Sequence, residues 1–269
     1  MSTQRFAILA DIHGNPIALE AVLKDIASCG GVDQYLMLGD YAALGFDPCR
    51  VLKRLMEFKT ARFIRGNADR YVVSDDLPFP NLEEALKNPK LLGRFMRVAR
   101  SFAWTAGAIS ACGENDYSSW LSGLPLEMRM TLSDGTRVLA VHASPGNDDG
   151  VGLSPATSDE DMEKMVAGSE AELVLVAHTH VPFDRLVAGV RVVNPGSIGN
   201  PMAPDLRASY AILVADVSGY ELIFRRVDYD RQACIEMNRQ VKQPSWRYIE
   251  QFLLGQQRPH WEAKDPQEE

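Results

Sequence analysis

Short apolar runs alternate with amphipathic segments through the first 70 residues of the chain. The runs lie at residues 5–10, 34–38 and 61–64, and their length and composition predict strands. Between them, Asn15-Pro16 and Asp47-Pro48 each combine a capping side chain with a proline and precede apolar residues at helical spacing, which predicts two helices. Alternating strands and helices of this kind are typical of a parallel sheet with right-handed crossovers.

The pattern changes after this repeat. From about 72 to 127 the periodicity is helical without strands, and we interpret this segment as a helical cap inserted into a single domain of residues 1–254. Five further strands are expected at residues 136–145, 172–180, 190–199, 209–218 and 220–229. The last two should form a hairpin with a Ser218-Gly219 turn, and a second, partly antiparallel sheet would hold these strands. Residues from Asp230 to about Leu254 read as helix, and 255–269 as a polar tail.

Composition narrows the class of protein. With 46% hydrophobic and 24% charged residues among 269, the chain is an ordinary globular α/β protein. A net charge of -8 without a Lys/Arg-rich run argues against binding to long nucleic acid, and no apolar window is long enough to cross a membrane. The cysteines are far apart and form no C-x-x-C, which predicts reduced thiols and a cytoplasmic location; they are Cys29, Cys49, Cys112 and Cys234.

Polar side chains follow five of the expected strands at the point where each strand ends. They are Asp11 and His13, Asp40, Asn67, His142, and His178 with His180. In open α/β sheets ligands bind outside the carboxyl ends of strands, so residues from distant parts of the sequence can meet in one crevice. This set includes four of the five histidines of the chain.

Each of these residues taken alone also has a structural explanation. Asp11 could be a helix cap, Asp40 a turn residue, and His142 a core histidine. His178 and His180 lie two residues apart and project to the same side of an extended chain, which favours a joint role as ligands. Taken together, these positions favour a set of metal ligands. Glycines in turns would be enough to end five strands, so a purely structural role does not explain why carboxylates, an amide and imidazoles stand there instead.

Carboxylate and amide oxygens combined with imidazoles, without thiolates, suit divalent Mn, Fe, Co, Ni or Zn ions. Seven candidate ligands are too many for one ion, but they suit two ions ~3.5–4 Å apart that share one carboxylate. Such a pair binds both the attacking and the leaving oxygens of an in-line phosphoryl displacement. We therefore predict two divalent transition-metal ions, and hydrolysis by attack of a hydroxide that bridges them.

Five motifs resemble those of the calcineurin-like metallophosphoesterases. They are Asp11-Ile12-His13, Gly39-Asp40, Gly66-Asn67-Ala68-Asp69, Val141-His142-Ala143 and Ala177-His178-Thr179-His180. Their order and rough spacing agree with the family from residue 5 to about 200. The resemblance implies a two-sheet β-sandwich flanked by helices. The stretches GDYAALGFDPCRV and VNPGSIGNP look like the bacterial branch that includes small phosphodiesterases and diadenosine polyphosphate hydrolase-like proteins.

The resemblance also implies roles for single residues. Asp11, His13 and His180 would hold one metal ion. A second ion would be held by Asn67, His142 and His178, and Asp40 would bridge the two. The expected catalytic residues are Asn67, Asp69 and His142: Asn67 could also touch a phosphoryl oxygen, and Asp69 could support a ligand or donate a proton through water.

One departure from the family pattern bears on the substrate. Many members carry a histidine after the Gly-Asn pair that assists the leaving group, and this chain has Ala68. General acid catalysis contributes ~10²- to 10⁴-fold, so phosphodiesters and phosphoanhydrides with good leaving groups become the expected substrates. The other departure, Ala177 where the family often has glycine, should have little effect.

We expect a small, nucleotide-like phosphorylated substrate. Arg65 and Arg70 could clamp a second phosphate, although most arginines are solvated surface residues. Asn15 could face the site, although its capping role already explains it.

Two other functions remain open at this stage. The protein could be a non-catalytic interaction scaffold of the same fold, or a protein phosphatase. The full set of seven candidate ligands favours an enzyme over a scaffold. Ala68 and the acidic net charge make a protein phosphatase less attractive. The sequence does not indicate the oligomeric state.

Overall fold

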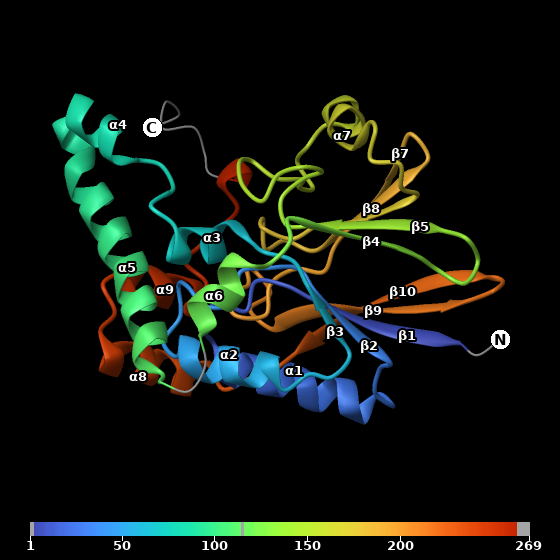
Figure 1. Ribbon diagram of the computed structural model, residues 1–269, viewed down its shortest axis with the longest axis horizontal. Helices are drawn as coiled ribbons and strands as arrows, with labels where there is room; N and C mark the ends of the chain where they lie inside the picture. The colour runs from blue at the N-terminus through green and yellow to red at the C-terminus, as the bar shows by residue number, and fades with distance from the viewer. Residues whose placement is uncertain (1–2, 114–115, 263–269) are drawn as a thin grey trace.

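The computed structural model describes residues 3–113 and 116–262, and its strands form two five-stranded sheets that face each other (Figure 1). The first sheet has the strand order β10 (Gly219–Val227), β9 (Ala208–Asp216), β1 (Gln4–Leu9), β2 (Gln34–Met37), β3 (Ala61–Phe63). The second has the order β4 (Glu127–Thr131), β5 (Arg137–Val141), β6 (Leu173–Leu175), β8 (Val190–Asn194), β7 (Phe183–Val187). Strands β1, β2 and β3 are parallel, and so are β5, β6 and β8.

Strand β1 shows why the central strands read as continuous apolar runs. Phe6 and Ile8 belong to the core between the two sheets, where they pack with residues of the second sheet such as Leu175. Ala7 and Leu9 alternate with them and belong to the core beneath the outer helices. Because both faces of this strand are buried, neither set of positions can be polar.

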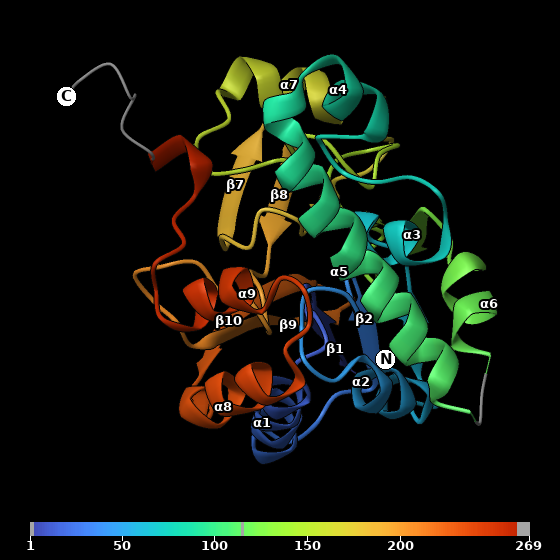
Figure 2. The same ribbon diagram turned by 90° about the vertical axis from the view of Figure 1, so that its left-hand side faces the viewer.

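The helices cover the two outer faces and one end of the sandwich. Helices α1 (Pro16–Ser28) and α2 (Pro48–Met56) lie on the first sheet, and α7 (Asp159–Val166) lies on the second (Figure 1). Figure 2 looks onto the end of the sandwich, where α3 (Asn67–Val73), α5 (Leu92–Ala111) and α9 (Trp246–Leu253) lie in front of the strands. This is the end toward which the parallel strands point.

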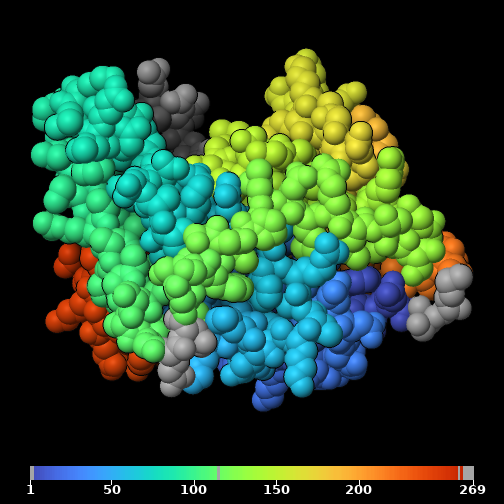
Figure 3. Space-filling view, viewed as in Figure 1, coloured from blue at the N-terminus to red at the C-terminus, as the bar shows by residue number. Residues whose placement is uncertain are grey.

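The remaining helices are short. They are α4 (Leu82–Lys87), α6 (Tyr117–Ser122), α8 (Arg231–Val241) and the 3₁₀ turns η1 (Pro89–Leu91) and η2 (His260–Glu262). Helix α4 and the first turns of α5 stand out from the rest of the molecule at one end (Figure 3). Helices α3 to α6 all lie between β3 and β4, so the predicted cap segment is helical up to β4. The division into one domain with a cap stays a prediction.

The predicted fold class, an α/β fold with two sheets and flanking helices, is confirmed. The strands and helices expected in the first 70 residues are present, and Asn15 caps α1 through its Oδ1, which accepts the Ala18 N–H at 3.0 Å. The assignment of all later strands to a second sheet is wrong. Strands β9 and β10 join the first sheet, where β9 runs antiparallel to β1 with Phe6 opposite Leu213.

Two local predictions also need correction. The β9–β10 hairpin exists, but Asp216 pairs with Gly219, so the turn residues are Val217 and Ser218. The carboxylate of Asp216 accepts the Ser218 N–H at 2.8 Å, which closes the turn one residue earlier than expected. The helix expected from Asp230 to Leu254 is two helices, because Lys242 adopts a left-handed conformation just before Pro244.

The prediction of four reduced thiols is wrong for two of them. Cys49, at the start of α2, and Cys112, at the end of α5, form a disulfide although 63 positions separate them in sequence. Folding brings their Cα atoms to 6.0 Å, a proximity that cysteine spacing alone does not reveal. Cys29 and Cys234 are free.

Two expectations concern the chain as a whole. Within the part of the chain that the structure describes, no helix is long and apolar enough to span a membrane. The expected polar tail, 255–269, begins after α9, and its residues 263–269 lie outside the described residues.

Candidate metal site

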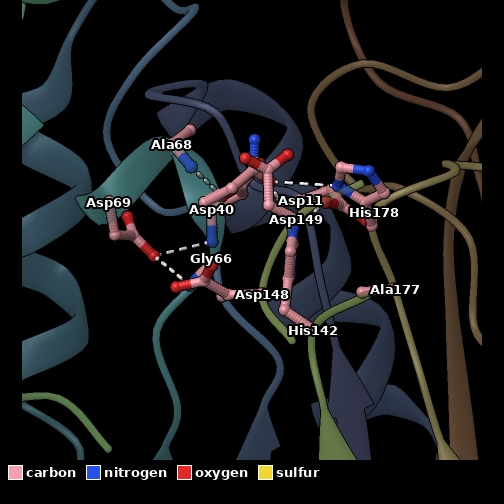
Figure 4. Close-up of polar contacts among 12 residues, drawn as sticks. Asp11, Asp40, Gly66, Ala68, Asp69, His142, Asp148, Asp149, Ala177 and His178 are labelled. Atoms are coloured by element: carbon pink, nitrogen blue, oxygen red, sulfur yellow. Dashed lines mark hydrogen bonds and ion pairs between the residues drawn. The ribbon is translucent and has the colours of Figure 1, made fainter. Parts of the chain in front are cut away.

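The loops that follow five strands meet at one end of the sandwich and are joined by backbone hydrogen bonds. The Asp11 N–H donates to the Gly39 carbonyl at 3.2 Å, and the His13 N–H donates to the Asp40 carbonyl at 2.9 Å. In the second sheet the Ala177 N–H donates to the His142 carbonyl at 2.7 Å. Figure 4 shows how these loops direct carboxylates and imidazoles toward one another. All seven candidate ligands found in the sequence lie in this cluster.

The carboxylate of Asp11 is buried without a hydrogen-bond partner. The residue is 0% exposed, and neither oxygen has a partner among the described residues. Its Oδ1 lies 3.6 Å from His180 Nε2 and 3.9 Å from His142 Nε2. Burial raises the pKa of Asp11 well above its usual value, and the neighbouring His142 opposes that shift. A buried carboxylate with open lone pairs is the environment expected of a cation ligand.

His13 and His180 direct unprotonated nitrogens at the same point. His13 Nδ1 lies 2.9 Å from the Ala43 carbonyl, and His180 Nδ1 lies 2.6 Å from the Asn200 carbonyl. A carbonyl only accepts, so each Nδ1 carries the proton and each Nε2 presents a lone pair. The two Nε2 atoms are 3.1 Å apart, and burial lowers the pKa of His180 to about 3, which keeps its ring neutral. A cation between the two nitrogens would remove the repulsion of their lone pairs.

A second group of lone pairs surrounds Asn67. His142 Nδ1 lies 2.6 Å from the Leu38 carbonyl, so its Nε2 faces Asn67 Oδ1 at 3.1 Å. His178 is reversed: its Nε2 lies 2.8 Å from the Gly150 carbonyl, and its Nδ1 faces Asn67 Oδ1 at 3.0 Å. Once a cation displaced the proton of His142, these three atoms would all offer lone pairs to it.

Asp40 lies between the two groups. Its Oδ2 is 3.7 Å from His13 Nε2 and 3.5 Å from His142 Nε2, while its Oδ1 accepts the Ala68 N–H at 2.9 Å. Burial tends to raise the pKa of Asp40, but the charge and hydrogen bond of His142 outweigh it, so the pKa falls below its usual value. Against the opposing effect of burial, the charge of Asp40 raises the pKa of His142 to about 10. A bound cation would take the place of that proton.

Two buried Asp/His clusters are thus consistent with a dinuclear metal site. One consists of Asp11, His13 and His180, and the other of Asp11, Asp40 and His142. Asp11 is common to both clusters, whereas the family resemblance implies that Asp40 bridges the two ions. The donor set fits divalent transition ions, and the assignment of single residues to single ions stays a prediction.

Backbone strain concentrates in the same residues. Five of the candidate ligands adopt positive φ angles between 49° and 66°: Asp11, His13, Asp40, His178 and His180. Such angles are uncommon for residues other than glycine and persist only where the surrounding structure imposes them. The loops therefore hold these side chains in fixed directions at an energetic cost, as expected for a functional site.

Asp69 organises the loops rather than lining the open site. Its Oδ2 accepts the N–H groups of Asp40 at 2.7 Å and Gly66 at 2.9 Å, and its Oδ1 accepts that of Tyr41 at 2.9 Å. Burial, followed by the charge of Asp40, raises the pKa of Asp69 to about 7. The predicted role of Asp69 as ligand support agrees with these contacts, and its catalytic role stays a prediction.

The loop after β8, whose first residues were expected to belong to a strand, also positions the cluster. Ser197 Oγ donates to the Asp11 carbonyl at 2.9 Å, and the Asn200 carbonyl accepts from the His180 ring. Gly199 is required here, because a Cβ at this position would lie 2.0 Å from the Ile12 carbonyl. The contacts of Ser197 and Gly199 with the loop after β1 join residues more than 180 positions apart, so no local pattern could reveal them.

A cavity of about 500 Å³ opens onto the cluster. His13, Asp40, Asn67, His178 and His180 contribute to its lining from the cluster side. The other walls include side chains that the sequence reading did not select: Phe79, Arg94, Arg97, Tyr248 and Phe252. Most of these come from α5 and α9, and only their three-dimensional position connects them with the site.

The expected substrate-binding residues have other partners. Arg65 pairs with Asp148, with Nε and Oδ2 at 2.7 Å, and Arg70 pairs with Asp148 and also with Asp76 at 2.7 Å. Asn15 caps α1 and donates to the Gly199 carbonyl at 3.3 Å. None of the three lines the cavity, so a role in substrate binding stays an untested prediction.

The family model for the calcineurin-like phosphoesterase superfamily domain matches residues 5–218, most of the chain. The chain belongs to this superfamily. Members of a superfamily share a fold and a site plan, so this finding and the buried Asp/His clusters support each other. It does not identify the branch or the substrate.

Several relatives of this phosphoesterase-superfamily chain share its full extent. An uncharacterized protein of Methanocaldococcus jannaschii, MJ0912, is 26% identical over 95% of this chain and 100% of its own. The crystal structure of the hypothetical protein PH1004 from Pyrococcus horikoshii matches with a TM-score of 0.74 and 25% identity, over 92% of this chain and 97% of that one. That of a metallophosphoesterase from Sphaerobacter thermophilus matches at 0.69 with 24% identity, over 94% and 98%, and shows the fold.

Proposed function

We propose that the protein is a dinuclear-metal-dependent phosphoesterase that hydrolyses phosphodiesters or nucleotide phosphoanhydrides. The observation that carries this proposal is the carboxylate of Asp11, which is buried without a hydrogen-bond partner among the described residues and lies 3.6 Å from His180 Nε2 and 3.9 Å from His142 Nε2. A structural role would leave Asp11 hydrogen-bonded, because an unpaired buried charge is costly. A scaffold that only binds partners would not need this arrangement.

The residues of the chain have separable tasks in the proposed reaction. Two bound transition-metal ions would supply an activated water and neutralise the charge that develops on the phosphoryl oxygens. The carbonyls of Ala43, Leu38 and Asn200 fix the ring tautomers of three histidines. Asn67 lies on the cavity side of the cluster, where its amide can contact a phosphoryl oxygen.

The cavity and Ala68 favour small substrates with good leaving groups. A volume of about 500 Å³ falls in the range of ~300–1,000 Å³ typical of small-molecule sites. Ala68 lines this cavity and offers no proton to a leaving group. The proposed substrate is therefore a small, nucleotide-like phosphodiester or anhydride rather than a phosphoprotein or a long nucleic acid, as in the diadenosine polyphosphate hydrolase-like branch.

A substrate panel tests this function. Purified protein would be assayed with bis-p-nitrophenyl phosphate, diadenosine tetraphosphate, p-nitrophenyl phosphate and a phosphopeptide, each with Mn²⁺ and with chelator. We expect turnover of the first two with Mn²⁺, loss of turnover with chelator, and loss in an Asp11→Asn variant that keeps the size of the side chain. Absence of turnover with every substrate and several divalent ions would favour the scaffold, and preference for the phosphopeptide would favour a protein phosphatase.

A cytoplasmic location belongs to this proposal as well. It suits a nucleotide-like substrate and agrees with the absence of a membrane-spanning helix among the described residues. The Cys49–Cys112 disulfide counts against this location, because disulfides are rare in cytosolic proteins, so the substrate class is the main argument for it.

A further inference from the structure

Two arginines of α5 line the cavity opposite the candidate ligands. Arg94 and Arg97 lie one helical turn apart, and both contribute to the cavity lining. The guanidinium of Arg94 lies 5.5 Å from the centre of the Phe79 ring, which also lines the cavity. Residues three apart on a helix project from the same face, so the two guanidinium groups can act on one ligand.

These arginines differ from most others in the described chain because they have no carboxylate partner. Among the described residues no carboxylate lies within ion-pair distance of either one, whereas Arg65 and Arg70 are both paired with Asp148. Asp40 is the one carboxylate among the described residues that line the cavity, and it belongs to the candidate metal cluster. In a protein of net charge -8, two unpaired arginines in the wall of a cavity mark a site for an anion.

We infer that Arg94 and Arg97 bind a second phosphate group of the substrate, so that the preferred substrates are phosphoanhydrides rather than simple phosphodiesters. This inference rests on the proposed function, because it places the reacting phosphate at the Asp/His cluster. One cavity holds both sites, and its volume of about 500 Å³ suits a ligand of nucleotide size.

The same arrangement explains how the proposed hydrolysis can proceed although residue 68 is an alanine and supplies no general acid to the leaving group. Hydrolysis forms a bond from a water oxygen to the phosphorus at the cluster and breaks the bond from that phosphorus to the bridging oxygen. The leaving phosphate keeps the bridging oxygen and the electron pair, and the protons of the water pass to the two phosphate products and the solvent. A phosphate leaves as a stable anion, so it needs the positive charge of Arg94 and Arg97 rather than a proton donor.

The inference can be tested by measuring kcat/KM for two substrates, one with a second phosphate group and one without it. The double variant Arg94→Gln with Arg97→Gln removes both charges but keeps unbranched polar side chains of similar helix propensity. Arg100→Gln is the control, because Arg100 is exposed on the same helix, as Arg94 and Arg97 are, but does not line the cavity. We expect kcat/KM for diadenosine tetraphosphate to fall about 10- to 100-fold in the double variant, as for loss of charge-assisted hydrogen bonds. Activity on bis-p-nitrophenyl phosphate, which has no second phosphate, should stay nearly unchanged. Equal losses on both substrates, or no loss on either, would overturn the inference.

A binding measurement separates this inference from the proposed function. Calorimetric titration of inorganic pyrophosphate into chelator-treated protein requires no turnover. We expect the double variant to bind more weakly than the wild type and Arg100→Gln to bind as the wild type does. If no substrate is hydrolysed but this difference appears, the proposed function fails and the anion site stands. Equal binding by the wild type and the double variant, or no binding by the wild type, would refute the anion site.

Discussion

At the scale of single residues, Asp11 and Ala68 define the chemistry of the site in opposite ways. Asp11 presents a buried carboxylate without a hydrogen-bond partner among the described residues, an environment that a bound cation would stabilise. Ala68 is 2% exposed and lines the cavity, so a position from which a side chain could reach the leaving group carries only a methyl group. In the proposed reaction, the first residue would hold a metal ion, and the second would restrict the substrates to those with leaving groups that need no proton.

Replacing Ala68 with histidine tests this restriction. In Ala68→His the imidazole would enter the cavity and could protonate a poor leaving group. We expect the ratio of activity on p-nitrophenyl phosphate or phosphoserine to activity on bis-p-nitrophenyl phosphate to rise, by up to ~10²-fold for general acid catalysis. Ala68→Phe is the control, because it adds a ring of similar size without a proton to donate. A ratio that stays the same in Ala68→His, or rises equally in both variants, would contradict the explanation.

The candidate ligands could be found from the sequence because each follows a buried strand and belongs to a residue type that binds metals. Arg94 and Arg97 could not, because arginines on an amphipathic helix look the same whether they face water or a cavity. For Arg65 and Arg70, proximity in sequence to Asn67 suggested the substrate, while the structure gives them Asp148, some 80 positions away, as a partner. Charge partners distant in sequence are invisible to a local pattern.

At the scale of elements, the start of α3 is built around the absence of a side chain. A Cβ on Gly66 would lie 2.1 Å from Asp40 Oδ1 and 2.6 Å from the Asp40 backbone nitrogen. Helix α3 therefore approaches the loop after β2 closely enough for the Ala68 N–H to bind Asp40. Through this hydrogen bond, the position of α3 helps to set the orientation of the carboxylate of Asp40, a candidate metal ligand.

Two matched glycine substitutions test this packing. Gly66→Ala should destabilise the protein by ~1–3 kcal/mol, as other overpacked sites do, and should weaken metal binding because Asp40 must move. Gly107→Ala lies on the exposed face of α5 with no atom within 4 Å of its new methyl group, and should stabilise the protein by about 0.5–1 kcal/mol. Denaturant unfolding measures both changes. A Gly66→Ala protein as stable as the wild type, with unchanged metal affinity, would argue against the close approach.

The elements missed in the sequence share a physical cause. Strands β4 and β7 are at the two edges of the second sheet, where only part of each strand is buried, so neither shows a long apolar run. Helix α7 was missed for a related reason: only Met162 and Val166 of its eight residues are buried. Central strands such as β1 are buried on both faces and were read correctly. The long apolar run that predicts a strand therefore comes from burial of both faces of the strand, rather than from strand formation itself.

At the scale of the whole molecule, the candidate site exists because two sheets end together. Asp11, His13, Asp40 and Asn67 follow strands of the first sheet, and His142, His178 and His180 follow strands of the second. The order of these motifs could be read from the sequence. The sheet to which β9 and β10 belong and the Cys49–Cys112 disulfide could not, since both depend on contacts between distant segments.

The most direct test of the shared site is the metal content of the protein. Elemental analysis of wild-type protein purified without chelator should find about two equivalents of transition metal per chain. The Asp11→Asn variant should hold clearly less, because Asp11 is common to both clusters. A wild-type protein that takes up no divalent ion even when it is supplied, or an Asp11→Asn variant with the same metal content as the wild type, would contradict the account.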